Sequence, residues 1–451
     1  MKADILILGA GPGGYETALS AARQGKSVVL FNGGQLGGTC LNEGCIPTKC
    51  LCRNADVVTL LKEGDKFGID DFTFTLDYNK VLSRKNEVIS SLRGGVDTLL
   101  KQAKVTVINA FATFKDSKTV IANGEEFTGD SIIIATGSIS RSLPISGAEL
   151  ECVMDSKKIL EIEYIPASLT IIGGGVIGME FASIFQQLGS KVTVIEYMKQ
   201  ILPPFDSDIA KRLKQVLSKK GINIVTGAVA KEIRQNEFYE IEVVYEAKGK
   251  EEIVVSSDLL MAVGRAPKVE GLNLEGIGVN FSPKGIFVDD CMRTNVAGIY
   301  AIGDVTGKMM LAHVATMQGE RALHTINGCQ DKIRFDIVPS AVFTNPECGM
   351  VGLTEEECKS QGIEIMTGTS FYRANGKSLA MGETDGICKL IFRKDNGRLL
   401  GAHIMGVEAA DLVQQCGDLM TGNTTLNELK YIIFGHPTVS EVIRSAALAV
   451  K

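Results

Sequence analysis

The sequence predicts an α/β chain of about three domains, the last of which is a mixed α+β region. Its 451 residues suffice for about three units of roughly 150 residues each. A strand, a glycine-rich turn, a helix and a second strand follow one another twice, once at the N-terminus and once in the middle of the chain. From about Val338 onward, alternating segments such as Lys389–Phe392 and a helical stretch after Glu408 indicate the α+β region.

The composition is that of an ordinary globular protein. Hydrophobic residues make up 45% of the chain and charged residues 22%, which excludes a disordered or collagen-like chain. Lys and Arg number 47 against 53 Asp and Glu, a net charge of -6, and no basic cluster occurs. We therefore expect no nucleic-acid partner and no association with a membrane.

The sequence indicates neither a membrane span nor an export signal. The most apolar stretch, Leu169–Phe185, is interrupted by three consecutive glycines and by Glu180. Only four residues precede the apolar run Ile5–Leu8, too few for a signal peptide. Eleven cysteines, an odd number spread over the chain, favour a reducing compartment. We expect a cytoplasmic protein.

The two β-α-β units carry the glycine spacing of dinucleotide-binding turns. The first consists of the strand Ile5–Leu8, a turn with Gly9, Gly11 and Gly14, a helix over Tyr15–Gln24 and the strand Ser27–Phe31. The second consists of the strand Leu169–Ile172, a turn with Gly173, Gly175 and Gly178, a helix ending at Leu188 and the strand Lys191–Glu196. Such a glycine pattern is weak alone, but here each copy lies between an apolar strand and a helix. Two Rossmann-like dinucleotide-binding domains, and hence two cofactors, are predicted.

The residue at the end of each unit's second strand indicates which dinucleotide binds. The glycines permit a tight turn and leave free N–H groups and a helix N-terminus for the pyrophosphate. In the second unit, Glu196 can accept hydrogen bonds from ribose hydroxyls and would repel a 2′-phosphate, which favours NAD over NADP. In the first unit the corresponding residue is Asn32, which can bond a ribose but carries no charge.

Two cysteines after the first unit point to redox chemistry. Cys40 and Cys45 lie in the segment GGTCLNEGCIPTK, and such a pair can close a small ring and reopen it. If the segment is helical, the two residues lie about one and a half turns apart, so that a disulfide would distort the helix and be reducible. Zinc binding that also uses Cys50 and Cys52 is an alternative, but the spacing lacks paired C-x2-C knuckles. We predict no metal site, and packing roles for Cys50 and Cys52.

Several segments together resemble the flavin disulfide reductases over essentially the whole chain. Besides the glycine-rich turns and the cysteine segment, these are Ile134–Gly137, Ala262–Pro267, Ile299–Asp304, Leu311–His313 and His436–Glu441. The sequence is most similar to the members that oxidise dihydrolipoyl groups. The resemblance implies an enzyme that oxidises protein-bound dihydrolipoyl groups to lipoyl groups and reduces NAD+ to NADH, with FAD and NAD as cofactors.

The resemblance also implies which residues hold the cofactors. For FAD these are Gly9, Gly11, Gly14, Asn32, Lys49, Ala112, Thr136, Gly137, Asp304 and Ala312. For NAD they are Gly173, Gly175, Gly178, Glu196, Ala228, Gly264 and Arg265. Asp304 would hold the ribityl chain of the flavin. Gln318, like Asn32, stands where relatives usually have Glu, and we expect both to affect flavin affinity.

The catalytic residues follow from the same resemblance. Cys45 corresponds to the thiol beside the flavin ring, and Cys40 to the thiol that exchanges with the substrate. Lys49 would lie near the flavin and stabilise negative charge on it. Glu180, on the helix of the second unit, would pair with Lys49 near the nicotinamide.

A dithiol substrate requires a base, because the thiolate rather than the thiol is the nucleophile. His436 fits this role, with Glu441 five residues later to orient its imidazole ring. The other histidines, His313, His324 and His403, have no comparable acid in a recognisable motif. In the family the base comes from the partner subunit, so the resemblance implies a homodimer with shared active sites.

The chain is expected to form three domains. Residues 1–139 and 263–335 are expected to form the FAD domain, 140–262 the NAD domain and 336–451 the interface domain.

The expected partner is a lipoyl-bearing protein, either the acyltransferase core of a 2-oxoacid dehydrogenase complex or the glycine cleavage H protein. A glutathione-type or mercuric reductase is the main alternative, although Glu196 disfavours NADPH and the chain ends without a cysteine pair. A non-catalytic FAD-binding scaffold would leave the cysteine pair idle.

Overall fold

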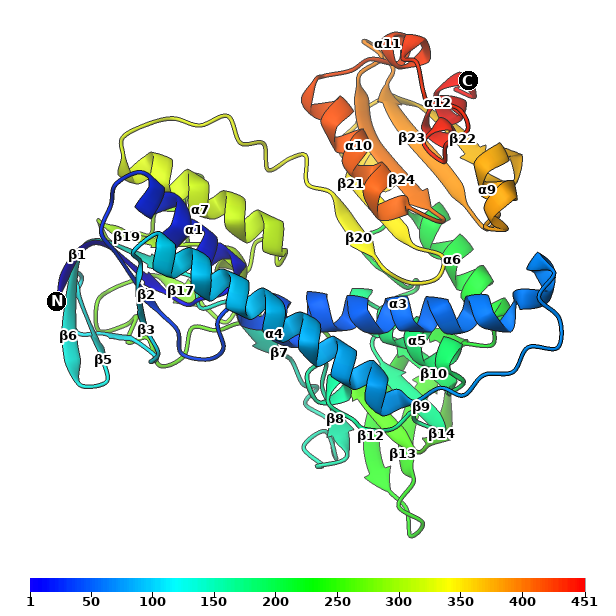
Figure 1. Ribbon diagram of the computed structural model, residues 1–451, viewed down its shortest axis with the longest axis horizontal. Helices are drawn as coiled ribbons and strands as arrows, with labels where there is room; N and C mark the ends of the chain where they lie inside the picture. Colours follow the sequence, from blue (N-terminus) through cyan, green and yellow to red (C-terminus); the bar gives the residue numbers. More distant parts are fainter. Residues whose placement is uncertain (451) are drawn as a thin grey trace.

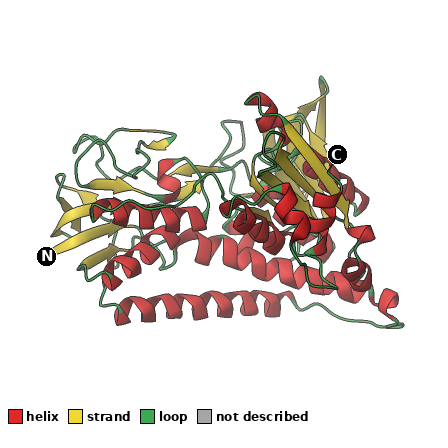
Figure 2. Ribbon diagram, turned by 90° about the horizontal axis from the view of Figure 1, so that it is seen from above, coloured by secondary structure: helices red, strands yellow, loops and turns green. Residues whose placement is uncertain are grey.

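The computed structural model describes residues 1–450 and has three sheet-centred regions joined by two long helices (Figure 1). The N-terminal sheet and the C-terminal sheet lie at opposite ends, and the middle of the chain forms a third region below them in this view. The long helices α3 (Cys45–Lys62) and α4 (Tyr78–Gln102) run side by side along the molecule (Figure 2). Asp77 begins α4 by accepting a hydrogen bond from the Lys80 amide with its carboxylate.

The N-terminal sheet is mainly parallel. In spatial order it contains β3 (Thr106–Ile108), β2 (Val28–Phe31), β1 (Lys2–Leu8), β6 (Glu125–Ile134), β5 (Thr119–Ala122) and β4 (Thr113–Phe114). A strand from much later in the chain, β19 (Ile299–Ala301), pairs in parallel with the end of β6. Helices α1 (Pro12–Arg23) and α7 (Ala312–Ile326) pack against each other over this sheet. The sheet is therefore completed only after the chain has passed through the middle region.

The middle region contains a second parallel sheet and an antiparallel one. The parallel sheet has the order β11 (Asn223–Thr226), β10 (Lys191–Glu196), β9 (Ser168–Ile172), β15 (Asp258–Met261) and β8 (Val153–Met154). The antiparallel sheet contains β12 (Ala228–Gln235), β13 (Ile241–Ala247) and β14 (Lys250–Ser256). Helix α5 (Val176–Leu188) packs against β10 and β9 of the parallel sheet, and helix α6 (Ser207–Lys219) contacts β11. Two short strands, β7 (Ser138–Ser140) and β16 (Arg265–Pro267), pair where the chain enters and leaves this region.

The C-terminal region is an antiparallel sheet with helices packed against it. Its strand order is β20 (Ser340–Val342), β21 (Cys348–Gly352), β24 (Leu399–Met405), β23 (Ile387–Arg393) and β22 (Ile365–Phe371). Its helices are α8 (Glu355–Ser360), α9 (Gly376–Met381), α10 (Ala409–Thr421), α11 (Leu426–Tyr431) and α12 (Glu441–Leu448). A further hairpin earlier in the chain consists of β17 (Phe281–Ser282) and β18 (Gly285–Ile286). These sheets confirm the predicted α/β fold with a C-terminal α+β region.

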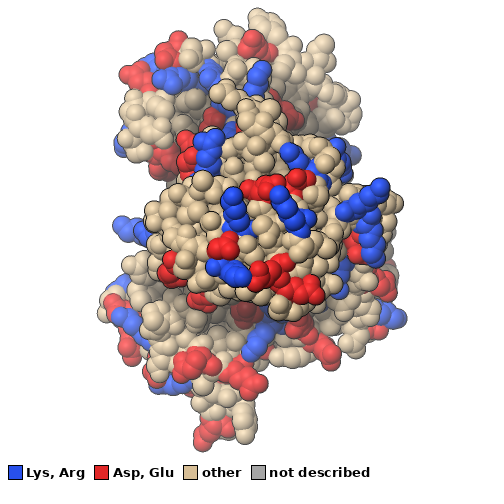
Figure 3. All heavy atoms as spheres, turned by 90° about the vertical axis from the view of Figure 1, so that its left-hand side faces the viewer, with Lys and Arg blue, Asp and Glu red and all other residues tan. Residues whose placement is uncertain are grey.

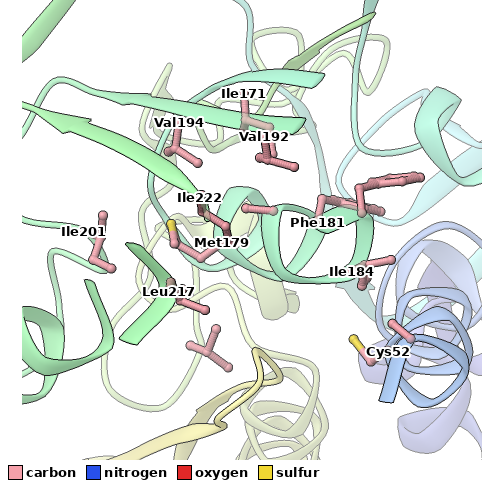
Figure 4. Close-up of a cluster of buried hydrophobic side chains, with 14 of the residues drawn as sticks. Cys52, Ile171, Met179, Phe181, Ile184, Val192, Val194, Ile201, Leu217 and Ile222 are labelled. Carbon is pink, nitrogen blue, oxygen red and sulfur yellow. The ribbon is translucent and has the colours of Figure 1, made fainter. Parts of the chain in front are cut away.

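The largest apolar core lies where α5 packs between its parallel sheet and α3. Figure 4 shows Met179, Phe181 and Ile184 of α5 among strand residues such as Ile171 and Val194, with Cys52 of α3 at the edge. Phe181 and Ile184 are almost completely buried. Burial of such side chains contributes about 1.5–3 kcal/mol each. Because α5 and α3 share this core, the helix of the second β-α-β unit is held beside the helix that carries Cys45.

Two surface features bear on the predicted partners. On the face drawn in Figure 3, acidic and basic side chains are interspersed and neither sign forms a continuous patch. Within residues 1–450, none of the helices combines the length and the apolar composition that crossing a bilayer requires.

Candidate active site

A cavity of about 1140 Å³ runs between the three regions of the fold. It begins at the first glycine-rich turn, passes Cys40 and Cys45, and ends at the first turns of α5. Of the residues predicted to hold FAD, those on its wall are Gly9, Gly11, Asn32, Lys49, Ala112, Thr136, Gly137, Asp304 and Ala312. Gly14 lies behind the wall, because a Cβ on it would be 1.8 Å from the carbonyl oxygen of Gly9. The cavity therefore joins the first dinucleotide turn to the cysteine pair.

The first glycine-rich turn fits a pyrophosphate. Gly9 has a φ of +114°, which favours glycine, and α1 begins at Pro12 without a side-chain cap on its N-terminus. Gly11, Pro12 and Gly13 lie on the cavity wall, so the uncapped N-terminus of α1 faces the cavity, as an anion at this position requires. At the end of β2, Asn32 lies on the cavity wall with its side-chain amide donating to Asn109 Oδ1 at 3.0 Å. The side-chain oxygen of Asn32 remains available to accept a hydrogen bond from a ribose.

Asp304 is held by a short chain of hydrogen bonds. The Ser138 hydroxyl donates to Asp304 Oδ2 at 2.6 Å, and Arg265 Nε donates to Ser138 Oγ at 2.7 Å. Arg265 Nη2 also donates to the Ser138 carbonyl at 2.9 Å. Arg265, which we predicted for the NAD site, therefore lies on the wall of the same cavity as Asp304. Nearby, the Gly303 amide donates to Gln318 Oε1 at 2.6 Å, so that Gln318 supports the turn that carries Asp304.

The cysteine pair straddles a break between two helices. Cys40 lies in α2 (Gly38–Glu43) and Cys45 begins α3, with Gly44 between them at a φ of −148° and a ψ of −104°. The segment is therefore not one continuous helix, and the expected spacing of one and a half turns does not apply. The break at Gly44 brings the two thiols together without distorting a regular helix. Both cysteines are present as thiols.

The two thiols have different proton affinities. Hydrogen bonding from Cys40, helped by the Lys49 charge, lowers the pKa of Cys45 to about 7 although burial opposes it. The same hydrogen bonding and burial raise the pKa of Cys40 above its usual range. Of the two thiols, Cys45 is therefore the one that ionises more readily. This asymmetry suits a pair in which one sulfur is a stable thiolate and the other exchanges with a substrate.

Lys49 and Glu180 form an ion pair one helical turn beyond Cys45. Lys49 Nζ donates to both Glu180 oxygens at 2.9 Å, and Glu180 is 4% exposed. Burial alone would lower the pKa of Lys49, but the Glu180 carboxylate outweighs it and leaves the pKa raised. Glu180 comes from α5 and Lys49 from α3, so the pair joins the second β-α-β unit to the helix of the redox cysteine. A charged ammonium thus remains at the cavity wall.

Replacing Lys49 by methionine should raise the pKa of Cys45. The variant removes the positive charge that lowers this pKa and leaves the Glu180 charge, which raises it. We expect an upward shift of about one unit or more. The rate of Cys45 alkylation in the reduced protein, followed against pH by mass spectrometry, measures the shift. Lys62→Met, in the last turn of the same helix, is the matched control, and a Lys49→Met profile like that of the control would contradict the expectation.

The second glycine-rich turn is built like the first, and its residues Val176 and Ile177 lie on the cavity wall. Gly173 has a φ of +113°, and a Cβ on Gly178 would lie 1.9 Å from the Gly173 carbonyl oxygen. Gly175 precedes α5 and has open space around it. Glu196 is buried and accepts hydrogen bonds from the backbone amides of Gly174 and Met198. Ala228 begins β12 in the same region, and Gly264 precedes Arg265 with a φ of +100°.

His436 and Glu441 contact each other but lie away from the cysteines of their own chain. His436 Nδ1 is 3.1 Å from Glu441 Oε1, and the Thr438 amide donates to Glu441 Oε2 at 3.0 Å. The Thr438 amide, followed by His436, lowers the pKa of Glu441. The His436 side chain is 77% exposed and does not lie on the wall of the cavity. Within one chain, the structure therefore leaves the predicted base separated from the predicted dithiol.

The remaining cysteines of α3 are buried in packing positions. Cys50 and Cys52 are 8% and 7% exposed. Cys52 Sγ donates to the Phe343 carbonyl at 3.4 Å, and burial raises the pKa of Cys52 above its usual range. Among the residues that the structure describes, no group of three His, Cys, Asp or Glu side chains is arranged to hold a metal ion.

Comparison with known proteins identifies the family. Residues 3–319 match the pyridine nucleotide-disulphide oxidoreductases, and residues 338–447 match the dimerisation domain of the same family. The chain belongs to this family. It is therefore an oxidoreductase with FAD and NAD as cofactors, and its dimerisation domain supports the predicted homodimer.

Relatives and solved structures agree with this assignment. The chain is 37% identical to a dihydrolipoyl dehydrogenase of Bacillus subtilis (strain 168), over 99% of this chain and 98% of that protein. It is 39% identical to a dihydrolipoyl dehydrogenase of Thermus scotoductus, over 99% of this chain and 97% of that one. The HOCl-induced flavoprotein disulfide reductase RclA from Escherichia coli superposes with a TM-score of 0.89 at 30% identity, over 99% of this oxidoreductase and 100% of RclA.

Ser138 and Phe343 are among the residues of the oxidoreductase's cavity wall that were not predicted from the sequence. Ser138 bridges Asp304 and Arg265, and Phe343 contacts both Lys49 and Glu180. Ser138 directly follows the predicted Thr136-Gly137 pair, and that proximity was the one signal available. Phe343 follows an edge strand of the C-terminal sheet, and nothing in its local sequence distinguishes it from a core aromatic residue.

Proposed function

We propose that the protein is an NAD-dependent dihydrolipoyl dehydrogenase. It would oxidise protein-bound dihydrolipoyl groups to lipoyl groups and reduce NAD+ to NADH. The observation that carries the proposal is the pair of unequal thiols on the wall of the dinucleotide cavity. Curated relatives named dihydrolipoyl dehydrogenase that align over nearly the full chain support the choice of substrate.

The proposed reaction begins with Cys40 and Cys45 joined in a disulfide. His436 of the partner subunit takes a proton from one dihydrolipoyl sulfur, and Glu441 orients its ring. The resulting thiolate attacks Cys40 Sγ, breaks the Cys40–Cys45 bond and releases Cys45 as a thiolate. The second dihydrolipoyl sulfur then attacks the first, which frees Cys40 and closes the lipoyl ring. Two electrons have now passed from the substrate to the cysteine pair.

Residues of this chain would stabilise the reduced Cys40–Cys45 pair and support the transfer of its electrons to the flavin. FAD, when bound, accepts electrons from the dithiol and transfers them as hydride to NAD+. Cys45 would hold negative charge beside the flavin, since its pKa is lowered to about 7. Lys49 would stabilise the charge that develops on the flavin, and Glu180 would keep the Lys49 ammonium in place.

The cofactor contacts are proposed from the two glycine-rich turns. Gly9, Gly11 and Gly14 would form the turn beneath the FAD pyrophosphate, and Asp304 would hold the ribityl chain. The other FAD contacts would be Asn32, Ala112, Thr136, Gly137 and Ala312, which lie on the cavity wall. NAD would bind over Gly173, Gly175 and Gly178, with Glu196, Ala228, Gly264 and Arg265 around it.

The exposed side chains of Tyr431 and Ile433 support the proposal of a shared active site. Tyr431 and Ile433 are 87% and 95% exposed, which is unusual for large apolar side chains next to a candidate base. We propose that a partner subunit covers them and that its Cys40 lies near His436. We infer a homodimer whose subunits each consist of an FAD domain (1–139 and 263–335), an NAD domain (140–262) and an interface domain (336–451).

The physiological partner is proposed from the substrate. A protein-bound lipoyl group would be presented by the acyltransferase core of a 2-oxoacid dehydrogenase complex or by the glycine cleavage H protein, in the cytoplasm. The similarity to RclA keeps a different disulfide substrate as the second candidate. Assays of purified protein with dihydrolipoamide and NAD+, and with oxidised glutathione and NADPH, separate the two. Turnover with the second pair alone would overturn the proposal.

Glu196→Ser should shift the coenzyme preference toward NADP. The carboxylate would accept bonds from the ribose in NAD and repel the 2′-phosphate of NADP. We expect the ratio of kcat/KM for NAD+ to that for NADP+ to fall by about tenfold or more. Glu232→Ser, at a half-buried position in the middle of β12, is the control. An unchanged ratio in Glu196→Ser would exclude the proposed ribose contact.

A further inference from the structure

Phe343 lies between the redox helix and the NAD-region helix, although it comes from the C-terminal region. It directly follows β20 and lies on the cavity wall together with Lys49 and Glu180. Its backbone amide donates to Glu180 Oε1 at 2.9 Å. Its ring faces the Lys49 ammonium, with Nζ 4.5 Å from the ring centroid. One residue thus contacts both members of the ion pair, the carboxylate through its backbone and the ammonium through its side chain.

Hydrogen bonds to several elements hold the segment that carries Phe343 in place. The Asn345 amide donates to Ser183 Oγ of α5 at 3.0 Å, and Asn345 Nδ2 donates to Asp56 Oδ1 of α3 at 3.0 Å. Lys220 Nζ donates to the Asn345 carbonyl at 2.9 Å and to its Oδ1 at 2.7 Å. These contacts join the segment to both helices that carry the ion pair. The Phe343 ring is therefore presented at a fixed place.

We propose that Phe343 is a positioning residue for the redox centre, holding Lys49 through its ring and Glu180 through its amide so that the ammonium stays beside Cys45. The aromatic face is negative and attracts an ammonium, most strongly where water is excluded. Glu180 holds the Lys49 ammonium from one side, through both of its carboxylate oxygens. The contact with the Phe343 ring restricts the Lys49 ammonium from a second side. The C-terminal region thereby contributes to the electrostatics of a dithiol that lies in another region of the chain.

The inference rests on the proposed redox role of Cys40 and Cys45, but its test reads the thiols directly. The charged groups that act on the Cys45 thiol are Lys49 and Glu180, and the other thiol that acts on it is Cys40. A lysine that loses its aromatic contact stabilises the Cys45 thiolate less well. The pH profile of Cys45 alkylation therefore reports on Phe343 whatever the disulfide substrate is, and failure of the lipoyl assignment would leave this measurement unaffected.

Phe343→Leu removes the ring and keeps the backbone amide. We expect the apparent pKa of Cys45 in the reduced holoenzyme to rise by about half a unit. Phe343→Tyr retains an aromatic face and should restore the original profile. Phe371→Leu is the matched control, because its ring also lies under cations, 5.5 Å from Arg212 Cζ and 5.0 Å from Arg373 Cζ. It should leave the Cys45 profile unchanged.

A double-mutant cycle separates positioning from general packing. If Phe343 acts through Lys49, then Phe343→Leu should have no further effect on the Cys45 profile in a Lys49→Met background. A merely structural role would lower the melting temperature equally in both backgrounds. Should the leucine variant lose its flavin, Phe343→Met fills a similar volume without a ring and allows the same comparison. A Phe343→Leu profile identical to that of the wild type, or a shift that persists without Lys49, would overturn the proposal.

Discussion

Replacing Cys45 by serine is expected to abolish the oxidation of dihydrolipoamide while FAD remains bound. The serine hydroxyl can neither form the disulfide with Cys40 nor leave as a stable anion, so electrons from the substrate have no route to the cofactor. We expect kcat to fall by about 10⁴-fold or more, as it does when a covalently participating group is lost. Steady-state turnover of dihydrolipoamide with NAD+, normalised to flavin content, measures the effect.

A matched control lies on the same helix. Cys50 is buried and is not part of the proposed redox pair, so Cys50→Ala should retain turnover close to that of the wild type. Reduction of the flavin by NADH should persist in Cys45→Ser, since this half-reaction does not need the dithiol. Retained dihydrolipoamide turnover in Cys45→Ser would mean that another pair of thiols, or none, transfers the electrons.

Replacing His436 by alanine is expected to slow dihydrolipoamide oxidation by about 10²- to 10⁴-fold, the usual contribution of a general base. The loss should be confined to the reaction with thiols. Oxidation of NADH by a small quinone, which bypasses the dithiol substrate, should continue at the original rate. A proportional loss of both activities would point to a structural role for His436 rather than to proton transfer.

Mixed dimers test whether His436 acts across the interface. A heterodimer of one Cys45→Ser chain and one His436→Ala chain should have one intact site, because the unmodified His436 of the first chain faces the unmodified cysteines of the second. Purified by two different affinity tags, it should recover about half of the wild-type activity per dimer by this site count. If base and cysteines belonged to the same chain, both sites would be damaged and the heterodimer would be inactive.

The dinucleotide turns could be predicted from the sequence because their requirements are local. Gly173 needs a positive φ and Gly178 has no room for a Cβ, so the spacing of glycines between a strand and a helix reports directly on the backbone. Glu196 was identifiable for the same reason, as it ends the strand that follows the turn. In each case a few neighbouring residues determine the geometry.

Contacts between distant segments could not be predicted from local sequence patterns. Only the family resemblance brought Lys49 and Glu180 together, since no local pattern joins residues 131 positions apart. The contact of Phe343 with this pair depends on how the C-terminal region packs between α3 and α5, which local sequence does not encode. The break of the redox segment at Gly44 was also missed, because glycine is permitted in a helix as well as at its end.

The most direct test of the proposed function is an anaerobic spectral titration of the purified protein with dihydrolipoamide, followed by NAD+. We predict a yellow protein that develops a long-wavelength absorbance band as the Cys45 thiolate forms beside the flavin, followed by loss of the band and formation of NADH when NAD+ is added. The same titration with NADPH and oxidised glutathione should leave the protein largely unchanged. A flavin that responds only to NADPH, and not to dihydrolipoamide, would contradict the account.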